Sequence, residues 1–527
     1  MTHESRRAAA VRPLRMRLSG RTPAARLVFV LALLLPTSVR AADRPRVYVG
    51  SKSFAENVIL GEMLCHLIAD AGGRPVHLYW LGDTGKAWNG LVRGDLDVYV
   101  EYTGTLAKDI LEGENLADGD DAALREALAR HGLRMSSPLG FNNTYALAVK
   151  ARTADDLGIH KLSELIRYLN KPDHKDLKFG FSHPFLERAD GWAKLKGRGL
   201  PQHVHPGRAL DHSFVYKALK DGTLDVTDVY STEPQTLDPD LKLLEDDIDC
   251  FPKYYAVILY RTDLLPRAPK VVDSLLRLQG QINDKEMTAL NARVVLHDVH
   301  EIQATADYLS TKLTLHVPVV IPTMWQNILL WTGEHLFLVA LSLAVGIVIA
   351  VPLGVLAARK PWLGQAVLAA VGVVQTVPAL ALLFFLSVLL GLGVVPALVA
   401  LFFYSLLPIV RNTYTGLKDI PIPLRESAEA LGLSPLARLR LIELPLAARS
   451  ILAGIKTAAV INVGNATLGG LIAAGGYGTP IIIGLNKNNV GILLQGAIPA
   501  VLMALAIIVL FEVVERFTVS PGLRLKG

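Results

Sequence analysis

A series of long apolar segments in the second half of this chain restricts its fold more than any other feature. These segments lie near residues 336–357, 363–394, 395–411, 451–474 and 493–515. Each approaches or exceeds the roughly 20 residues that an α-helix needs to cross a bilayer. Across all 527 residues, 51% of the side chains are hydrophobic and the mean hydropathy is +0.35. The sequence therefore predicts an all-α, polytopic membrane domain over residues 336–527.

Basic residues beside the apolar segments indicate how the chain crosses the membrane. They form three groups, Arg359 with Lys360, Lys418 with Arg425, and Arg516 with Arg524 and Lys526. Because lysine and arginine favour the cytoplasmic side, only an odd number of crossings satisfies all three groups. We therefore expect five spans, the second of them kinked or partly re-entrant at Pro378. Whether residues 363–394 form one broken span or two stays open.

The first 42 residues have the composition of a secretory signal sequence. They hold eight arginines and one acidic residue, Glu4, and therefore carry a net charge of +7, against +6 for the whole chain. An apolar run from Leu27 to Leu35 and a small-residue cleavage site at Val39–Ala41 follow. We expect residues 1–42 to be a signal, with an uncleaved anchor as the alternative. Because the basicity belongs to this leader, we expect no nucleic-acid partner.

Residues 43–318 alternate short β-rich runs with helical stretches, which is typical of α/β layers. Residues 94–98 and 222–226 repeat the pattern Gly-x-Leu-Asp-Val, and each leads through a strand to a tyrosine, Tyr102 or Tyr230. Ligands of open α/β sheets bind beyond the carboxyl ends of strands. The repeat therefore predicts two lobes that face each other, with Tyr102 and Tyr230 across one cleft.

Motifs for catalysis, cofactors and metals are weak or incomplete. Residues 82–86 end in Gly-Lys but lack the spacing and the Ser/Thr of a P-loop, so we expect no ATP hydrolysis by this chain. His203, His205 and His212 lack the spacing of metal ligands. We expect neither an enzyme nor a cofactor or metal site. Cys65 and Cys250, the only cysteines, are either bridged or free.

The charged stretch between the third and fourth apolar segments is predicted to form two short helices. Leu424–Leu431 is a good helix former and Gly432 interrupts it. Ser434 and Pro435 then offer an N-cap and a first-turn proline. We expect the second helix to run from Pro435 to about Glu443 and to end at Pro445.

This stretch resembles the EAA loop by which permease subunits of ABC importers dock on a separate ATPase. Glu426-Ser427-Ala428, Gly432 and Ile442–Pro445 stand at the spacing of that loop, with Ser427 in place of an alanine. The resemblance implies a cytoplasmic ABC ATPase as partner and a permease homodimer. The docking residues that it implies, within residues 424–445, are Glu426, Gly432, Ile442, Leu444 and Pro445.

Four blocks of the first half look like those of binding proteins for glycine betaine, choline, carnitine and related quaternary ammonium solutes. The blocks are Gly50–Glu56, Glu101–Thr105, Asn142–Leu147 and Phe251–Tyr255. The family implies a periplasmic-binding-protein-like fold. It also implies a tyrosine cage of Tyr102, Tyr145, Tyr230 and Tyr254 for the methylated nitrogen, and Lys52, Thr105 and Arg188 for a carboxylate. Asn143 stands where some relatives carry an acidic residue, and Trp192 is an alternative cage member.

Together these features predict a fused importer subunit of the inner membrane that functions in osmoprotection. The expected parts are a signal (1–42), an extracytoplasmic binding domain (43–318), a linker (319–335) and a permease domain (336–527). Two alternatives stay open, a membrane-tethered solute sensor and an importer of amino acids or another compatible solute.

Overall fold

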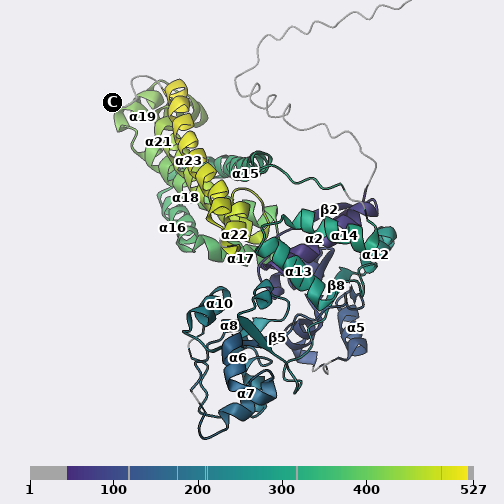
Figure 1. Cartoon of the computed structure of the whole chain (residues 1–527). Coiled ribbons are helices and arrows are strands. Elements are labelled where there is room, and N and C mark those ends of the chain that lie inside the picture. Colours follow the sequence, from purple (N-terminus) through teal and green to yellow (C-terminus); the bar gives the residue numbers. More distant parts are fainter. Residues whose placement is uncertain are drawn as a thin grey trace, which may run out of the picture. The chain divides into compact units, whose positions relative to one another are not determined.

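The computed structural model describes residues 44–519 except 115, 117–118, 175, 208, 211, 316–317 and 488. The predicted leader and the last basic residues of the chain lie outside the described residues. The described part contains an α/β region, residues 44–315, and a helical region, residues 324–519 (Figure 1).

The first lobe of the α/β region is built on a five-stranded sheet. Its strands are β1 (Arg46–Gly50), β2 (Arg74–Leu78), β3 (Val98–Tyr102), β4 (Leu133–Met135) and β8 (Ala256–Arg261). They lie in the order β2-β1-β3-β8-β4, with β1 parallel to β2 and β3, and with β8 antiparallel to β3 and β4. Helix α2 (Ala55–Asp70) follows β1 and is buried along nearly its whole length.

The second lobe is built on a three-stranded antiparallel sheet of β5 (Tyr145–Lys150), β6 (Val226–Tyr230) and β7 (Leu241–Leu244), in the order β6-β5-β7. In sequence it is inserted between β4 and β8, so the chain passes between the lobes twice. The predicted two-lobed arrangement is confirmed. Strands β3 and β6 both end at the predicted tyrosine, one in each sheet.

Helices and short turns complete the two lobes. Asp83 caps the start of α3, and Asn283 forms a capping box with Glu286 at the start of α13. The remaining elements are α3 (Thr84–Arg93), α4 (Thr103–Thr105), η1 (Leu106–Ile110), η2 (Glu112–Glu114), α5 (Asp121–Arg130), α6 (Ala151–Leu157), α7 (Leu162–Leu169), α8 (His183–Glu187), α9 (Trp192–Gly197), α10 (His212–Asp221), η3 (Pro234–Leu237), α11 (Leu264–Arg267), α12 (Pro269–Leu276), α13 (Asp284–Val295) and α14 (Glu301–Leu313).

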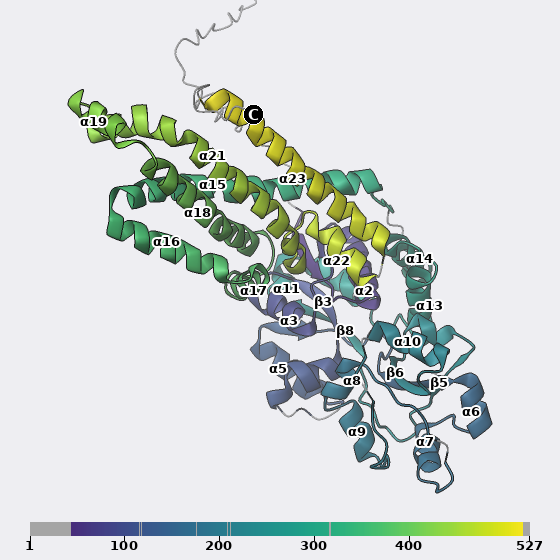
Figure 2. The same ribbon diagram turned by 90° about the vertical axis from the view of Figure 1, so that its left-hand side faces the viewer.

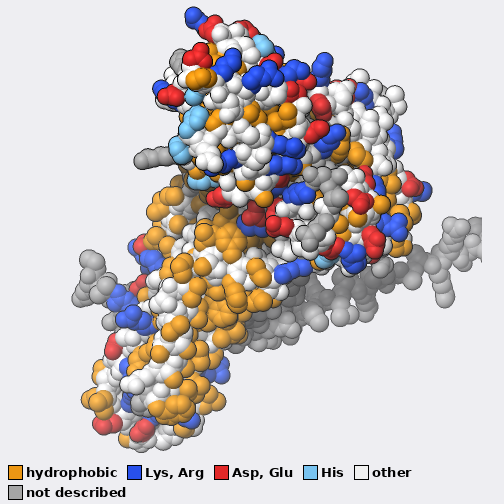
Figure 3. All heavy atoms as spheres, turned by 90° about the horizontal axis from the view of Figure 1, so that it is seen from below, with side chains coloured by type: hydrophobic (Ala, Val, Ile, Leu, Met, Phe, Trp, Pro, Cys, Tyr) orange, Lys and Arg blue, Asp and Glu red, His pale blue; other side chains and the backbone are white. Residues whose placement is uncertain are grey.

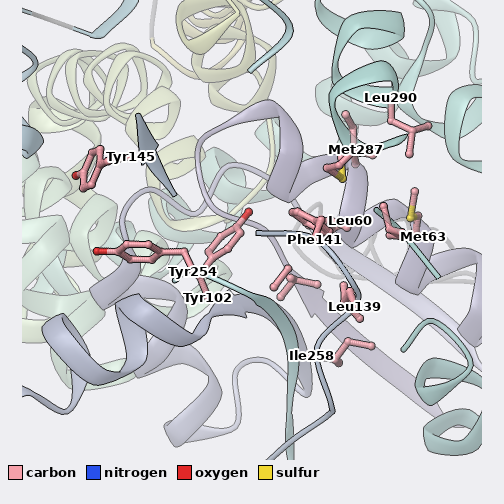
Figure 4. Packing of buried hydrophobic residues seen from close by; sticks show 14 of the residues in the cluster. Leu60, Met63, Tyr102, Leu139, Phe141, Tyr145, Tyr254, Ile258, Met287 and Leu290 are labelled. Atoms are coloured by element: carbon pink, nitrogen blue, oxygen red, sulfur yellow. The ribbon is translucent and has the colours of Figure 1, made fainter. Parts of the chain in front are cut away.

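The hydrophobic core of the α/β region extends to the tyrosines that the sequence singled out. Leu60 and Met63 of α2 pack with Leu139 and Ile258 in a cluster that also contains Tyr102, Tyr145 and Tyr254 (Figure 4). Burial of these rings explains why they are held in fixed positions.

The helical region consists of long apolar helices with short elements between them (Figure 2). The elements are α15 (Met324–Arg359), α16 (Pro361–Thr376), α17 (Ala379–Leu390), α18 (Val394–Lys418), α19 (Ile422–Ala430), α20 (Pro435–Arg438), η4 (Leu439–Glu443), α21 (Leu444–Ala466), η5 (Thr467–Ile472), α22 (Gly478–Asn486) and α23 (Val490–Thr518). Helices α15, α18 and α21 contact one another, and α23 lies against α21.

By length and composition, four helices of the described residues are able to cross a membrane, or five if α16 and α17 together form one span. These two helices meet at an angle of 92°, with Pro378 at the junction, so the predicted break at Pro378 is confirmed. Hydrophobic side chains cover much of the face of the helical region that Figure 3 shows, and Val348 and Val501 are 72% and 61% exposed. Such a surface is compatible with lipid rather than water.

Helix α15 begins at Met324, within the residues 319–335 that the sequence assigned to a linker. The Thr323 hydroxyl accepts a hydrogen bond from the Gln326 amide, and the Gln326 side chain accepts one from the Thr323 amide. This capping box starts the helix twelve residues before the apolar segment begins. Hydropathy alone does not predict this start of the helix, because it does not report the capping hydrogen bonds.

Candidate functional site

One cavity brings together all eight residues that the sequence implicated in solute binding. The residues lining it include Lys52, Tyr102, Thr105, Asn143, Tyr145, Arg188, Tyr230 and Tyr254. They come from both lobes and from the segments that join them. The structure therefore places side chains that are up to about 200 positions apart in sequence around one space.

Strand register places two of the four tyrosines face to face. Tyr145 opens β5 and pairs with Tyr230, the last residue of the antiparallel strand β6. Directly opposed side chains of antiparallel strands are close neighbours. The two rings stack with their centroids 5.2 Å apart and their planes at 28°.

The other two tyrosines are oriented by their hydroxyl groups. Tyr102 donates a hydrogen bond to Glu56 Oε1 at 2.6 Å, and Tyr254 donates one to Asp190. The Tyr254 ring lies edge-on to Tyr145 at 6.2 Å, and the rings of Tyr102, Tyr145 and Tyr254 are seen together in Figure 4. The hydrogen bonds of the two hydroxyl groups therefore fix the orientation of the Tyr102 and Tyr254 rings.

Burial favours the neutral form of three of these phenol groups. Burial raises the pKa of Tyr102 and Tyr145 well above the ordinary value, and it raises the pKa of Tyr230 to about 12. A neutral ring with a negative face attracts a cation without carrying a charge of its own.

Lys52 lies two residues after the end of β1, and Thr105 is the last residue of the short helix α4, which follows β3. The ammonium nitrogen of Lys52 contacts Glu101 Oε1 at 2.5 Å, and it lies 5.0 Å from the centre of the Tyr102 ring. Both members of this ion pair are buried. The positive charge of Lys52 is therefore balanced within the protein.

Arg188, at the end of α8, is also surrounded by acidic partners. Its Nε and Nη2 contact the two oxygens of Asp190 at 3.0 and 2.9 Å, and its Nη1 contacts Asp109 at 3.2 Å. Nη2 also donates to the Tyr254 hydroxyl at 3.1 Å. A guanidinium has five N–H donors. Four of them are already engaged, so no free pair is available for a second carboxylate.

The sequence analysis gave no role to Glu56, which lines the same cavity. Its carboxylate accepts four hydrogen bonds, from Tyr102 Oη at 2.6 Å, Asn143 Nδ2 at 2.8 Å, Thr232 Oγ1 at 2.5 Å and Asn291 Nδ2 at 2.9 Å. Burial raises the pKa of Glu56 above the ordinary value, and the four hydrogen bonds oppose that rise. Glu56 belongs to the block Gly50–Glu56, but its four partners lie 46 to 235 positions away from it in sequence.

Several other predicted candidates have structural roles. Trp192 packs against Phe181, with ring centroids 5.1 Å apart, in the core of the second lobe. Cys65 and Cys250 are free and buried, which resolves the alternative left open by the sequence. Of the three histidines, His203 stacks on His174 and His212 contacts Glu233.

Among the described residues, Glu62, Cys65 and His77 form a group with the ligand types of a metal site. Both ring nitrogens of His77 already contact neighbours, Glu62 at 2.8 Å and Ser51 at 3.0 Å. Burial raises the pKa of the Cys65 thiol well above its ordinary value, which disfavours the thiolate that binds metals. Glu62 and His77 belong to a hydrogen-bonded network of the first lobe.

The charged stretch of the helical region forms the two short helices that its sequence predicts. Gly432 adopts a left-handed conformation, with φ = 73°, between α19 and α20. Ser434 caps α20 through a hydrogen bond from the Ala437 amide. Arg438 forms ion pairs with Glu429 and Glu443, which join the two helices.

The predicted end of the second helix at Pro445 is wrong. The chain passes from α20 through the π-helical turn η4 into α21, with Pro445 in the first turn of α21. A wider turn leaves room for the proline ring, whose missing N–H costs little at a first-turn position. The stretch therefore continues directly into a long apolar helix.

The five predicted docking residues lie along this stretch. Glu426, Gly432 and Pro445 are exposed, and Ile442 and Leu444 are half-buried. Around them three leucines are mostly exposed, Leu431 (78%), Leu436 (72%) and Leu441 (63%). The stretch thus combines a rigid, ion-paired frame with an apolar surface.

Comparison with known proteins identifies both regions. Residues 45–311 match the family described as the substrate-binding domain of ABC-type glycine betaine transport systems, and this match spans just over half of the chain. The chain belongs to this family. Residues 350–519 match the inner membrane component of binding-protein-dependent transport systems. The protein is therefore a fused binding and permease subunit of an ABC importer, with several spans in the inner membrane.

Two permease proteins of Bacillus subtilis agree with the assignment of the helical region. The permease part is 45% identical over 193 residues to the glycine betaine/carnitine/choline transport system permease protein OpuCB of Bacillus subtilis, which covers 37% of this chain and 89% of the relative. It is 42% identical over 209 residues to the choline transport system permease protein OpuBB of the same organism, covering 40% and 96%. A solved glycine betaine/carnitine/choline ABC transporter structure is 28% identical, with coverage of 50% and 98% and a TM-score of 0.44.

Proposed function

We propose that this chain captures a quaternary ammonium solute of the glycine betaine or choline type outside the membrane and passes it through its own permease domain. The observation that carries the proposal is the clustering of four tyrosines around one cavity in a domain of this family. Residues 43–318 are then extracytoplasmic, as substrate capture for import requires.

The chemistry of the solute explains the tyrosines. A trimethylammonium group has no N–H to donate, so hydrogen bonds cannot recognise it. An aromatic face attracts a cation by about 0.5–2 kcal/mol when both are desolvated. Tyr102, Tyr145, Tyr230 and Tyr254 supply such faces, and three or four of them suffice for roughly micromolar binding.

A carboxylate-bearing solute such as glycine betaine needs a second contact point. Lys52 and Thr105 follow β1 and β3 and line the cavity, and we assign the carboxylate to these two residues. The Lys52 ammonium has three N–H donors, and Glu101 accepts from one of them. Arg188 has a different role, because its donors bind Asp190, Asp109 and Tyr254. We assign it to holding Tyr254 in place.

The energy for transport comes from a separate ATPase, which we expect to bind residues 424–445 on the cytoplasmic side. The exposed leucines of this stretch fit an apolar cleft, and its ion pairs make it a rigid lever. Because the stretch continues into α21, movement of the lever is transmitted directly to a membrane helix. We further expect two copies of the chain to form the permease.

Calorimetry on the full chain in detergent tests the substrate class. We expect choline, glycine betaine or carnitine to bind, and Tyr102→Ala and Tyr230→Ala to weaken binding at least tenfold. Tyr168→Ala, in a part of the second lobe away from the cavity, serves as the matched control and should bind normally. Absence of binding by all quaternary ammonium solutes contradicts the proposal. Binding of amino acids instead favours the alternative importer.

The sensor alternative differs in its partner. A sensor needs no ATPase, so an ATPase that co-purifies with the full chain supports import. Recovery of the chain without any ATPase, together with normal solute binding, favours the sensor.

A further inference from the structure

A buried carboxylate, Glu56, lines the binding cavity. It lies in the first turn of α2 and is 4% exposed. Its four hydrogen-bond partners are a tyrosine, a threonine and two asparagines. All four are uncharged, and among the described residues no cationic side chain pairs with Glu56.

Two cationic side chains that line the cavity, Lys52 and Arg188, form ion pairs with other acids. Lys52, four positions before Glu56, pairs with Glu101. Arg188 pairs with Asp190 and Asp109. Lys52 and Arg188 are therefore each balanced by acids of their own, whereas the negative charge of an ionised Glu56 has no cationic partner among the described residues. A buried charge without a counterion is costly unless a ligand supplies one.

The partners of Glu56 also come from both lobes. Tyr102 ends β3 of the first sheet, whereas Thr232 follows β6 of the second sheet. Asn143 lies in the segment that joins β4 to β5. The carboxylate thus connects the cage tyrosine of one lobe with the connecting segment and the other lobe.

We propose that Glu56 is the countercharge for the ammonium group of the solute and fixes the closed arrangement of the two lobes around it. The proposal rests on the function proposed above. The hydrogen bond from the Tyr102 hydroxyl places the carboxylate at the edge of the Tyr102 ring, and both residues line the cavity. The four donors lower the cost of keeping the carboxylate in the empty site. Aromatic faces and one carboxylate then act on the same cation.

A pair of ligands that differ only in charge separates this role from a structural one. Choline and 3,3-dimethyl-1-butanol have nearly the same shape, but only choline is a cation. We expect the full chain in detergent to bind choline more tightly than the alcohol. In Glu56→Gln this preference should fall by about tenfold, because an opposite charge at short range is worth one or more powers of ten.

Glu62→Gln is the matched control, since Glu62 is a buried acid of the same helix that does not line the cavity. It should leave the ratio of choline to alcohol affinity unchanged. If Glu56→Gln weakens both ligands by the same factor, Glu56 only holds the site together and the proposal is wrong. If Glu56→Gln proves too unstable to measure, Thr232→Val removes one donor and should alter the ratio in the same direction.

A different result is expected if the chain does not capture quaternary ammonium solutes at all. In that case the wild-type chain binds neither choline nor glycine betaine, whatever the Glu56→Gln variant does. Wild-type binding of choline with an unchanged preference in Glu56→Gln overturns only the role of Glu56.

Discussion

The neighbours of Arg188 decide what this side chain can bind. An arginine in a cleft for betaine-like solutes invites the interpretation of a carboxylate clamp, and the resemblance implies that role. Asp190 occupies the fork of the guanidinium with two contacts near 3 Å, and Asp109 takes a third. Because charge-assisted, bidentate ion pairs are strong, separating Arg188 from Asp190 costs free energy. The contacts of Arg188, rather than its residue type, therefore decide whether it can bind the carboxylate of a solute.

Asp190→Asn should therefore increase the affinity for glycine betaine relative to choline. The substitution removes the negative charge that neutralises Arg188 and frees the guanidinium for the carboxylate of the solute. We expect a gain of about tenfold in the affinity ratio, measured by competition binding to the full chain. Asp156→Asn, at an exposed site of α6, is the control. An unchanged ratio in Asp190→Asn contradicts this account of Arg188.

The pH dependence of binding provides a second test at the residue scale. Burial raises the pKa of Glu56 above 4.5 in the empty protein, so the folded chain keeps this proton to a higher pH than the unfolded chain. Through this group, the empty fold loses stability as the pH rises through the raised pKa. A cationic solute prefers the ionised carboxylate. Choline affinity should thus decline as the pH falls from neutrality toward 4.5, and should do so less in Glu56→Gln. Parallel pH curves for the two proteins count against the countercharge.

At the scale of elements, short strands and turns carry the functional geometry. The stack of Tyr145 on Tyr230 follows from the register of β5 and β6, since a slip of one residue turns one ring to the other face of the sheet. The docking stretch depends in the same way on one backbone conformation. Gly432 lies at φ = 73°, and open space surrounds the position of a Cβ there.

Gly432→Ala should weaken the coupling between ATP hydrolysis and transport. A left-handed backbone costs a residue with a Cβ about 1–2 kcal/mol, and this cost favours other angles between α19 and α20. We expect less ATPase bound to the purified chain, with solute affinity unchanged. Gly333→Ala, also in open space but in helical conformation, is the control. Equal ATPase recovery from both variants contradicts a lever role for Gly432.

At the scale of the whole molecule, capture and coupling must lie on opposite sides of one membrane. The helical region has enough apolar helices for four or five crossings. The proposed import mechanism requires residues 43–318 outside and residues 424–445 inside. The two natural cysteines are buried, which gives a low background for thiol labelling.

Single cysteines can report this topology. An impermeant thiol reagent should label Asp156→Cys in intact spheroplasts, and Ser434→Cys only after permeabilisation. Both positions are exposed, so access depends on the side of the membrane. Labelling of Ser434→Cys from outside contradicts the proposed import mechanism as a whole.

Much of this protein was predictable from local sequence. The apolar segments, the break at Pro378, the two short helices at Gly432 and the strand-end tyrosines all depend on residues near one another in the chain. The ends of the helices were harder to predict. A capping box at Thr323 starts α15 before the apolar segment, and a π-helical turn joins α20 to α21, with Pro445 in the first turn of α21. These two features are decided by hydrogen bonds that hydropathy does not report.

The sequence by itself determined the two-part architecture, because helix length, strand repeats and hydrophobic content are properties of consecutive residues. Only the tertiary structure decided the charges of the cavity. Glu56 meets Thr232 and Asn291, and Arg188 meets Asp109, across separations of 79 to 235 residues. Electrostatic roles depend on distance in space, and that distance is set by the packing of the two lobes.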